Sequence, residues 1–575
     1  KIGEREFLSQ DIEQVWDYAL DLKYFHEASH MAAIVPILIA EKAVKNEAWR
    51  ETLEMSENNK DKVYKPICIN PFGIKEILNF FCRIDGKKNS GGSLDGWENS
   101  RYCPTPSIIE AARILFQRHS VEEIAQNEAG KNLTITYKRI LEIIDEAQRE
   151  GRHCICFVTG VPGAGKTLVG LNLSAQRIDE KEKTHAVFLS GNGPLVKVLR
   201  EALTRDALLS ARKRGERTTK TEAGKPVEKF IQNVHHFRDD CLKDKRPPSE
   251  HIAVFDEAQR AWDLPATANF MRRKKNFIDF NMSEPEFLIS CLDRHKDWSA
   301  VICLAGGGQE IYRGEAGIGE WLAATNRSFQ HWHIYVSDKL SDSEYGDGKA
   351  LGQAKMHPNC HLEKDLHLSV SLRSFRSEKL SDFVKKLLDL EIQQAKDLFQ
   401  NLSEKYPIAI SRDINRAKNW ITQNARGSQR YGLLASSKAL RLKPDAIDIR
   451  VEIDPAHYFL DGKDDPRSSF YLEDAATEFQ SQGLELDWAL LAWEGDFRIK
   501  NGVWQHWDFR GDRWEHINSL ANQKYLKNAY RVLLTRARLG MCIYIPSGNP
   551  KDITRLPEFY NETCNYLTSL GIREI

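Results

Sequence analysis

The sequence has no apolar run long enough to cross a bilayer. Its longest strongly apolar stretch, Met31 to Ala40, covers ten residues, whereas a membrane-spanning helix needs roughly 20. The chain also does not open on a charged segment followed by an apolar core, so no signal peptide is indicated. We therefore expect a cytoplasmic protein with no membrane partner.

The sequence also lacks net charge, since its 82 basic residues balance 82 acidic ones. A nucleic-acid-binding protein with this balance needs a local basic surface. The run Ala211–Lys220 (ARKRGERTTK) supplies five basic side chains against one acid, and Arg272–Lys275 supplies four more. These runs are equally typical of solvated surface loops, so both interpretations stay open.

Cysteine motifs are absent as well, because the eleven cysteines include no C-x-x-C pair. Cys154 and Cys156 lie in the apolar run CICFVTG, which predicts buried thiols in a strand. His357, Cys360 and His361 lie close together in the sequence but have no second ligand pair, so a polar loop is expected there instead of a metal site.

The chain is long enough for several domains, and no solenoid-type repeat is found. Residues 1–90 combine a predicted helix (IEQVWDYALDLKYF) with a predicted strand (AAIVPILIA) and end near a glycine-rich linker. Residues 91–365 hold that linker and a parallel α/β pattern. Residues 366–575 repeat the α/β pattern, with a helical insertion expected near 378–425.

The strongest local signal is GVPGAGKT, which directly follows the apolar run HCICFVTG and precedes LVGLNLSAQRI with helical spacing. Strand, glycine loop and helix form the context in which a P-loop binds phosphates at a helix N-terminus. Lys166 is expected to reach the β and γ phosphates of ATP, and the Thr167 hydroxyl to ligate Mg²⁺. The predicted nucleotide-binding residues are Gly160, Val161, Pro162, Gly163, Ala164, Gly165, Lys166 and Thr167.

Two further apolar strands end in candidate catalytic residues. HIAVFDEAQRAW ends its strand at Asp256-Glu257, where Asp256 is expected to hold Mg²⁺ and Glu257 to activate the attacking water. Without a P-loop upstream, this pair would equally suit a helix cap. AVICLAGGGQEIYRGEAG ends in glycines and Gln309, which can sense the γ-phosphate or be an ordinary loop residue.

The order GVPGAGKT, DEAQ, GGGQ, SLRS, TEFQSQGLELD and NAYRVLLTRAR resembles the motif series of superfamily 1 helicases. The resemblance implies two RecA-like domains with ATP and Mg²⁺ between them. It implies that Arg373 and Arg536 neutralise charge on the transferring phosphoryl group. It also implies that Glu485 contacts the ribose, that Thr477–Gln480 faces the nucleic acid, and that Gly483 allows a close backbone approach.

The chain departs from that pattern in two places. GGGQE lacks the aspartate usual in the third motif, and no adenine-reading glutamine motif is recognisable upstream, where Tyr102 and Gln126 are the candidates. With FVTGVPGAGKT and DEAQRAW, these departures resemble a prokaryotic branch that shares its helicase-like module with the large Schlafen proteins. The resemblance covers residues 100–575.

The N-terminal segment carries a second, weaker resemblance. Gln14 and Tyr18 match the Q-x-x-x-Y motif of RecB-type nucleases with the PD-(D/E)XK fold, and Lys1 stands thirteen residues before Gln14, where that family has its signature lysine. The metal-binding acids of such a domain would then lie upstream of residue 1. Asp21-Leu-Lys23 fits the letters D-x-K but continues a helix. The alternative is an amphipathic helix that packs a small accessory domain.

We therefore predict an α/β protein with two RecA-like parallel-sheet domains and a small α/β nuclease-like N-terminal domain. The expected function is an ATP-dependent helicase or translocase that acts on nucleic acid, with DNA favoured over RNA as its partner. We expect it to be coupled to a nuclease-like domain and to act in bacterial defence against foreign DNA. One alternative is an ATPase switch that senses nucleic acid and gates a nuclease or a protein partner without unwinding. Another is a signalling NTPase whose partner is a protein.

Overall fold

The structure is a computed structural model that describes residues 1–30, 32–44, 49–51, 62–85, 94–98, 100, 107–117, 128–161, 163–176, 185–306, 314–341, 349–369 and 379–575. The chain divides into two compact units. The first comprises Lys1–Thr105 with Thr422–Arg430, and the second comprises Pro106–Ile421 with Tyr431–Ile575.

The first unit is a small α/β body. Its elements are α1 (Ser9–Phe25), η1 (Glu27–Ser29), β1 (Ile37–Ile39), β2 (Ile67–Ile69), η2 (Pro71–Gly73), α3 (Ile74–Asp85) and α4 (Leu94–Glu98). β1 and β2 run parallel over a core that includes Trp49 and Ile77. The strand expected over AAIVPILIA is only three residues long, because Pro36 has no N–H to donate and Ile34 forms an isolated bridge. Asp21 and Lys23 lie inside α1, as predicted.

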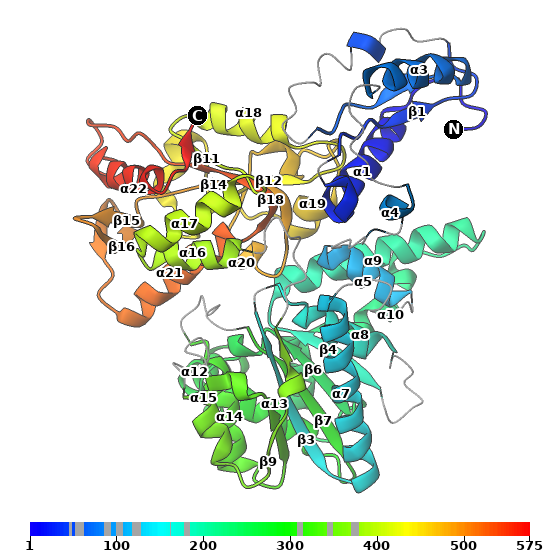
Figure 1. Ribbon diagram of the computed structural model, residues 1–575. Helices are drawn as coiled ribbons and strands as arrows, with labels where there is room; N and C mark the ends of the chain where they lie inside the picture. Colours follow the sequence, from blue (N-terminus) through cyan, green and yellow to red (C-terminus); the bar gives the residue numbers. More distant parts are fainter. Residues whose placement is uncertain are drawn as a thin grey trace. The chain divides into compact units, whose positions relative to one another are not determined.

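The second unit contains a large sheet whose strands all run parallel, in the order β5-β4-β6-β7-β3-β8-β9 with β10 beside β3 (Figure 1). Its strands are β3 (His153–Gly160), β4 (Ala186–Ser190), β5 (Ile231–Asn233), β6 (Ile252–Asp256), β7 (Ser299–Leu304), β8 (His333–Val336), β9 (Cys360–Leu362) and β10 (His367–Leu368). Cys360 and His361 therefore belong to an edge strand and not to a loop.

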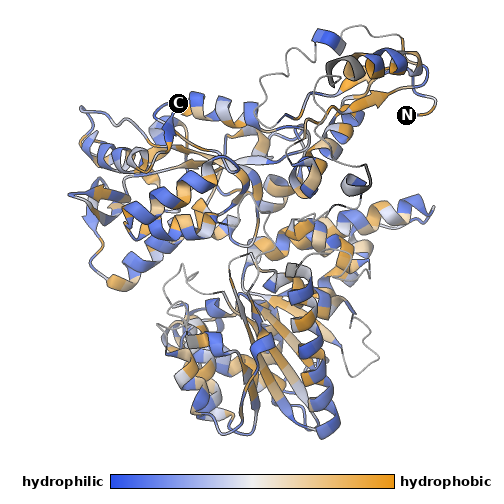
Figure 2. Cartoon of the chain, in the orientation of Figure 1, coloured by the Kyte–Doolittle hydropathy of each residue, from blue (hydrophilic) through white to orange (hydrophobic). Residues whose placement is uncertain are grey.

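Helices cover both faces of this sheet. They are α5 (Ile108–Phe116), α7 (Glu128–Glu150), α8 (Lys166–Gln176), α9 (Gly193–Lys213), α10 (Lys220–Phe230), α11 (Val234–Lys243), α12 (Leu264–Lys275), α13 (Glu284–Leu292), α14 (Gly317–Ser328) and α15 (Ala350–Lys355), with short turns η3 (Ala258–Arg260), η4 (Asp338–Ser341) and η6 (Lys364–Leu366). Cys154 and Cys156 point into the core on the α7–α8 face, whereas Ile155 and Phe157 point into the core on the α13–α14 face. Burial on both faces explains why residues 154–158 of β3 are all apolar. Figure 2 shows the same apolar character along most strands of both large sheets.

A second parallel sheet follows, in the order β13-β12-β14-β18-β11-β19. Its strands are β11 (Ile408–Ser411), β12 (Tyr431–Ala435), β13 (Ala475–Ala476), β14 (Leu486–Ala492), β18 (Ala537–Tyr544) and β19 (Arg573–Glu574). Its helices are α16 (Leu380–Leu388), α17 (Ile392–Ser403), α18 (Ile414–Asn424), α19 (Pro455–Leu460), α20 (Glu478–Ser481), α21 (Leu520–Leu534) and α22 (Glu558–Ser569), with turns η7 (Leu440–Asp445) and η8 (Ser469–Tyr471).

The segment 378–425 is thus not a purely helical insertion. Within its described part, α16 and α17 lead into β11, which pairs with β18 and β19 inside the sheet. A separate antiparallel sheet, formed by β15 (Phe497–Lys500), β16 (Val503–Arg510) and β17 (Arg513–His516), is inserted between β14 and α21. The two large parallel sheets confirm the predicted α/β class with two RecA-like domains. Among the described residues, no helix is both long and apolar enough to span a bilayer.

Candidate functional site

The glycine loop joins β3 to α8 in the predicted way. Gly160 has no room for a side chain, because a Cβ there would lie 2.7 Å from the Leu368 backbone oxygen in β10. Gly163 and Gly165 have φ values of +77° and +87°, the left-handed region that favours glycine. Pro162 lies outside the described residues. Three glycines of the motif are therefore required by packing or by backbone conformation.

The helix that follows the loop packs tightly on the sheet. α8 begins at Lys166, and a Cβ at Gly170 would lie 2.6 Å from Leu304 Cδ1 and 2.8 Å from Val254 Cγ1. This contact fixes the N-terminus of α8 at the carboxyl ends of β6 and β7. The unpaired N–H groups and the dipole of a helix N-terminus favour anions.

Two side chains of the first turn of α8 have defined partners. The Lys166 ammonium donates to the backbone oxygens of Gly160, at 2.8 Å, and Val161, at 3.2 Å. The Thr167 hydroxyl donates to Asp256 Oδ1 at 3.0 Å. The structure therefore brings together the predicted P-loop residues and the predicted acid of β6.

The carboxyl group of Asp256 has an unfavourable environment for its charged form. It is 3% exposed, and its Oδ2 atom is buried without a hydrogen-bond partner. Burial, together with the charge of Glu257, raises the pKa of Asp256 to about 8. Hard divalent cations prefer carboxylate and hydroxyl oxygens, and a cation would offset the charge of a buried carboxylate. The free Oδ2 atom and the Thr167 hydroxyl therefore fit Mg²⁺.

Glu257 follows Asp256 in a strained backbone conformation. Its φ and ψ are 52° and 45°, in the left-handed region that a non-glycine residue adopts only when its surroundings require it. Gln259 donates from Nε2 to Glu257 Oε2 and accepts from the Gly306 N–H at 3.0 Å. Gln259, 1% exposed, thus joins Glu257 to the end of β7. Sequence reasoning missed Gln259, and its only signal was its place in DEAQ.

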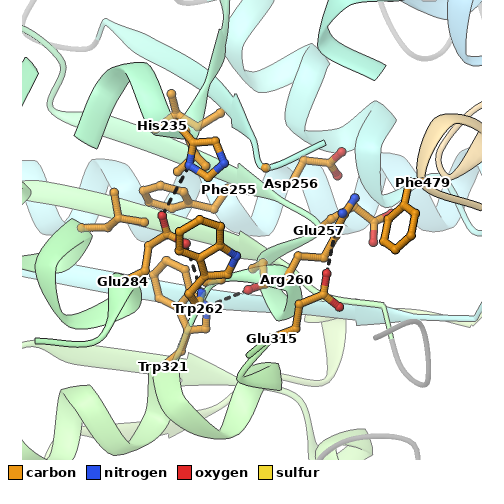
Figure 3. A pocket seen from close by; sticks show the side chains of 16 residues that line it. His235, Phe255, Asp256, Glu257, Arg260, Trp262, Glu284, Glu315, Trp321 and Phe479 are labelled. Atoms are coloured by element: carbon orange, nitrogen blue, oxygen red, sulfur yellow. Dashed lines mark hydrogen bonds and ion pairs between the residues drawn. The ribbon is translucent and has the colours of Figure 1, made fainter. Parts of the chain in front are cut away.

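A pocket of about 330 Å³ lies beside these acids (Figure 3). Its walls are rich in aromatic rings and also contain ion pairs. Glu284 accepts from the buried Arg238 at 2.8 Å, and Glu315 accepts from Arg260 Nε at 3.0 Å. Arg260 Nη1 is buried without a hydrogen-bond partner. The aromatic residues that line the pocket are His235, Phe255, Trp262, Trp321 and Phe479.

Two residues predicted to act on the nucleotide, Glu485 and Arg536, lie at the amino ends of neighbouring strands of the second sheet. Leu486, which follows Glu485, pairs with Ala537, which follows Arg536, so Glu485 and Arg536 precede neighbouring strands. The Arg536 side chain is 8% exposed and donates to the backbone oxygens of Val532, at 3.0 Å, and Leu484, at 3.4 Å. In this structure Arg536 ties the end of α21 to the segment before β14.

Gly483 does allow a close approach, but to protein. Its φ is +77°, and a Cβ there would lie 3.0 Å from Leu195 in α9. Beside it, Asn192 donates to the Gln482 backbone oxygen at 2.6 Å. These contacts join the loop after β4 to the segment before β14.

The segment Thr477–Gln480 has mostly internal partners. Thr477 and Gln480 form a capping box at the start of α20. Glu478 is buried and accepts from the backbone N–H and the hydroxyl of Ser437. Phe479, which lines the pocket, remains the member of this segment placed to meet a ligand.

Gln309, Arg373, Tyr102 and Gln126 lie outside the described residues. Both basic runs are described and have exposed residues. Ala211–Lys220 spans the end of α9 and the start of α10, where Arg214 pairs with Glu216 and Lys220 pairs with Glu201. Arg272–Lys275 forms the last turn of α12.

In the first unit, two predicted residues meet. The Lys1 ammonium donates to Gln14 Oε1 at 2.9 Å and pairs with Asp11 at 2.7 Å. The hydrogen bond with Asp11 raises the pKa of Lys1. Tyr18 lies on the same helix but is 60% exposed. Asp11 was not predicted, because nothing in the motif marks an acid at that position.

The sequence profile of one family, described as Schlafen group 3, DNA/RNA helicase domain, matches residues 153–547, more than half of the chain. No individual curated protein matches. Among solved structures, the helicase domain of Pyrococcus furiosus Hef is 12% identical, with a TM-score of 0.25, over 74% of this chain and 97% of that one. The DUF1998 helicase MrfA bound to DNA is 10% identical, with a TM-score of 0.28, over 76% of this chain and 54% of that one.

Proposed function

The chain belongs to the Schlafen group 3 DNA/RNA helicase domain family, and we propose that it hydrolyses ATP to act on nucleic acid as a helicase or translocase. The observation that carries the proposal is the pairing of Thr167 with Asp256, whose second oxygen is buried and unpaired. This pair lies at the N-terminus of a helix that begins with the P-loop lysine. Phosphate and a divalent cation suit these two neighbouring features.

The proposed roles follow from the side-chain chemistry. The loop N–H groups and Lys166 bind the phosphates, while Thr167 and Asp256 hold Mg²⁺, which when bound supplies positive charge beside the triphosphate. Glu257 accepts the proton of the attacking water, and Gln259 orients the Glu257 carboxylate. Gln309 is proposed to sense the γ-phosphate, Glu485 to contact the ribose, and Arg373 and Arg536 to neutralise the charge that develops on the phosphoryl group.

Arg536 must exchange partners to perform this role. Its guanidinium donates to backbone oxygens at the end of α21, so reaching a phosphate would release the tie to Leu484. The same release would loosen the segment before β14, which contacts Asn192 through Gln482. We propose that this exchange couples hydrolysis to a movement of the segment that contains Phe479, a residue that lines the pocket.

The experiment compares ATP hydrolysis, strand displacement and binding to labelled single strands of DNA and RNA. We expect ATPase activity that nucleic acid stimulates, DNA preferred over RNA, and binding that weakens as salt rises. Lys166→Ala should lose hydrolysis, whereas Lys551→Ala, which changes an exposed lysine in the turn between β18 and α22, should retain it. Stimulated ATPase without displacement would favour the switch over the helicase. Absence of binding at low salt would refute the nucleic-acid partner.

A nuclease-like role of the first unit is a second proposal. The observation that favours it is the Lys1–Gln14 hydrogen bond, which joins two residues of the motif that resembles RecB-type nucleases. Divalent-metal-dependent cleavage of DNA by the full-length protein, lost in Lys1→Ala and retained in Lys42→Ala, would support this role and a part in defence against foreign DNA. Equal cleavage by both variants would contradict it.

A further inference from the structure

Histidines gather where β6 and β7 begin, at the edge of the first large sheet opposite the P-loop. His251 directly precedes β6, and Asp297 lies two residues before β7. β6 and β7 pair in parallel, and the Ala300 N–H donates to the His251 backbone oxygen at 2.8 Å. His295 lies in the turn between α13 and β7. Two paired strands therefore hold these three side chains at one edge.

The three side chains converge. One ring nitrogen from each histidine and one carboxylate oxygen of Asp297 lie within 4.8 Å of one another. His251 Nε2 lies 3.4 Å from Asp297 Oδ1. The two imidazole rings lie 3.9 Å apart between centroids and are tilted by 35°. In a tetrahedral zinc site with bonds of roughly 2.0–2.1 Å, the ligand atoms stand roughly 3.4 Å apart.

A hydrogen bond fixes the tautomer of one imidazole, and the other imidazole has a buried nitrogen without a hydrogen-bond partner. His295 Nε2 lies 3.1 Å from the Glu250 backbone oxygen, to which it donates, and this leaves Nδ1 with its lone pair. His295 is 7% exposed, so its ring is held among buried groups. His251 Nδ1 is buried and has no hydrogen-bond partner. Asp297 is 43% exposed and opens the cluster to solvent.

We propose that His251, His295 and Asp297 bind Zn²⁺ or a similar divalent transition metal, with water as the fourth ligand. Two imidazoles and one carboxylate form a ligand set that suits Zn²⁺. The metal would hold together the beginnings of two paired strands. These are β6, which ends in Asp256, and its neighbour β7. This site is separate from the nucleotide site, so its test does not depend on the proposed function.

A neighbouring cluster supplies the control. His153, Asp293 and His331 also place ligand atoms within 4.8 Å of one another, on the other side of the beginning of β7. In that cluster, however, Asp293 already accepts from His331, at 2.7 Å, and from Trp332 Nε1, at 2.8 Å. Since the His331 side chain is 55% exposed, His331→Ala should fold normally.

The test titrates the chelator-treated full chain with Zn²⁺ against a competing chromophoric chelator, in the absence of ATP and nucleic acid. We expect His251→Ala, His295→Ala and Asp297→Asn each to weaken one equivalent of bound Zn²⁺ by about tenfold or more, and His331→Ala to leave it unchanged. Because Asp297 is partly exposed, Asp297→Asn carries the test if the histidine variants fail to fold. Added Zn²⁺ should raise the Tm of the wild type more than that of Asp297→Asn.

Co²⁺ offers a second readout, since tetrahedral coordination gives intense visible absorption. The wild type and His331→Ala should show these bands, and Asp297→Asn should lose or shift them. Unchanged Zn²⁺ affinity in all three ligand variants would overturn the proposal. Loss confined to His331→Ala would also overturn it, because the metal would then occupy the neighbouring cluster.

Discussion

Thr167 and Asp256, 89 residues apart in the sequence, are joined by a hydrogen bond of 3.0 Å from the hydroxyl to Oδ1. The second carboxylate oxygen of Asp256 is buried with no hydrogen-bond partner. A buried carboxylate that is only partly paired destabilises a fold. The molecule keeps this carboxylate at the carboxyl edge of its first large sheet, where the proposed Mg²⁺ would bind.

The first prediction concerns Asp256→Asn. The amide keeps an oxygen that accepts from Thr167 but cannot ionise. We expect Mg²⁺-dependent ATP hydrolysis to be lost, while the Tm in chelator stays equal to that of the wild type or rises by a few degrees. Phosphate release and thermal unfolding of both proteins check this. A Tm several degrees below that of the wild type would contradict the view that this carboxyl group destabilises the fold.

The second prediction concerns Glu257 and its partner Gln259. Glu257→Gln should retain ATP binding and slow hydrolysis by about 10²–10⁴-fold, the usual contribution of a general base. Gln259→Ala should lower kcat by about tenfold with little change in ATP affinity, because the Gln259 amide binds the Glu257 carboxylate and would act on the substrate only through it. Single-turnover hydrolysis and equilibrium binding of a labelled nucleotide separate the two effects.

The exposed Glu404→Gln provides the control for these variants and should match the wild type. If Gln259→Ala weakened nucleotide binding as much as it slowed hydrolysis, its effect would be structural. Such a structural effect would arise because Gln259 also accepts from the Gly306 N–H and so holds the left-handed backbone at Glu257 to the end of β7.

The sequence predicts the P-loop region well, because its signals are local. An apolar run that can be buried on both faces, a glycine loop and a helical repeat define β3, the loop and α8 within about 25 residues. Asp256-Glu257 is predictable for the same reason, since Asp256 ends a five-residue buried strand and Glu257 directly follows it. The meeting of Thr167 with Asp256 follows from parallel strands, whose carboxyl ends share one edge.

Features set by tertiary contacts were not predictable. β11 has four residues between helices, and only its pairing with β18 and β19 makes it a strand. The motif resemblance located Arg536 in the chain but could not show that its guanidinium binds the end of α21. Gln259 and Asp11 each contact a predicted residue through side-chain geometry, which one sequence does not reveal.

The third prediction concerns Arg536. Since its guanidinium satisfies carbonyl groups at the end of α21 and beside Gly483, Arg536→Ala should lower the Tm by a few degrees. If Arg536 also reaches the phosphates during turnover, hydrolysis should fall by about 10³-fold, while ATP affinity falls by less than about tenfold. ATPase kinetics and nucleotide binding, both measured well below the Tm, check this. Equal losses of binding and hydrolysis would assign Arg536 a purely structural role.

The last prediction rests on a buried carboxylate outside the nucleotide site. Glu494 follows β14, is fully buried, and accepts from the Tyr560 hydroxyl at 2.9 Å and from the Gly495 N–H at 2.6 Å. Its Oε2 atom has no hydrogen-bond partner. Burial, with a smaller effect of the charge on Asp496, raises the pKa of Glu494 to about 7.

A carboxyl group with a raised folded-state pKa holds its proton in the folded protein after the unfolded chain has lost it. Its contribution to stability is therefore complete below a pH of about 4.3, the unfolded value, and is lost as the pH rises through about 7. Glu494→Gln should remove this loss of stability, which is about 4 kcal/mol at most by the linkage relation. We expect the variant to gain a few degrees of Tm over the wild type at pH 8 and little or nothing at pH 5. Thermal unfolding across this range measures the difference, with Glu404→Gln as the exposed control. A gain equal at both pH values would show that Glu494 does not titrate between them.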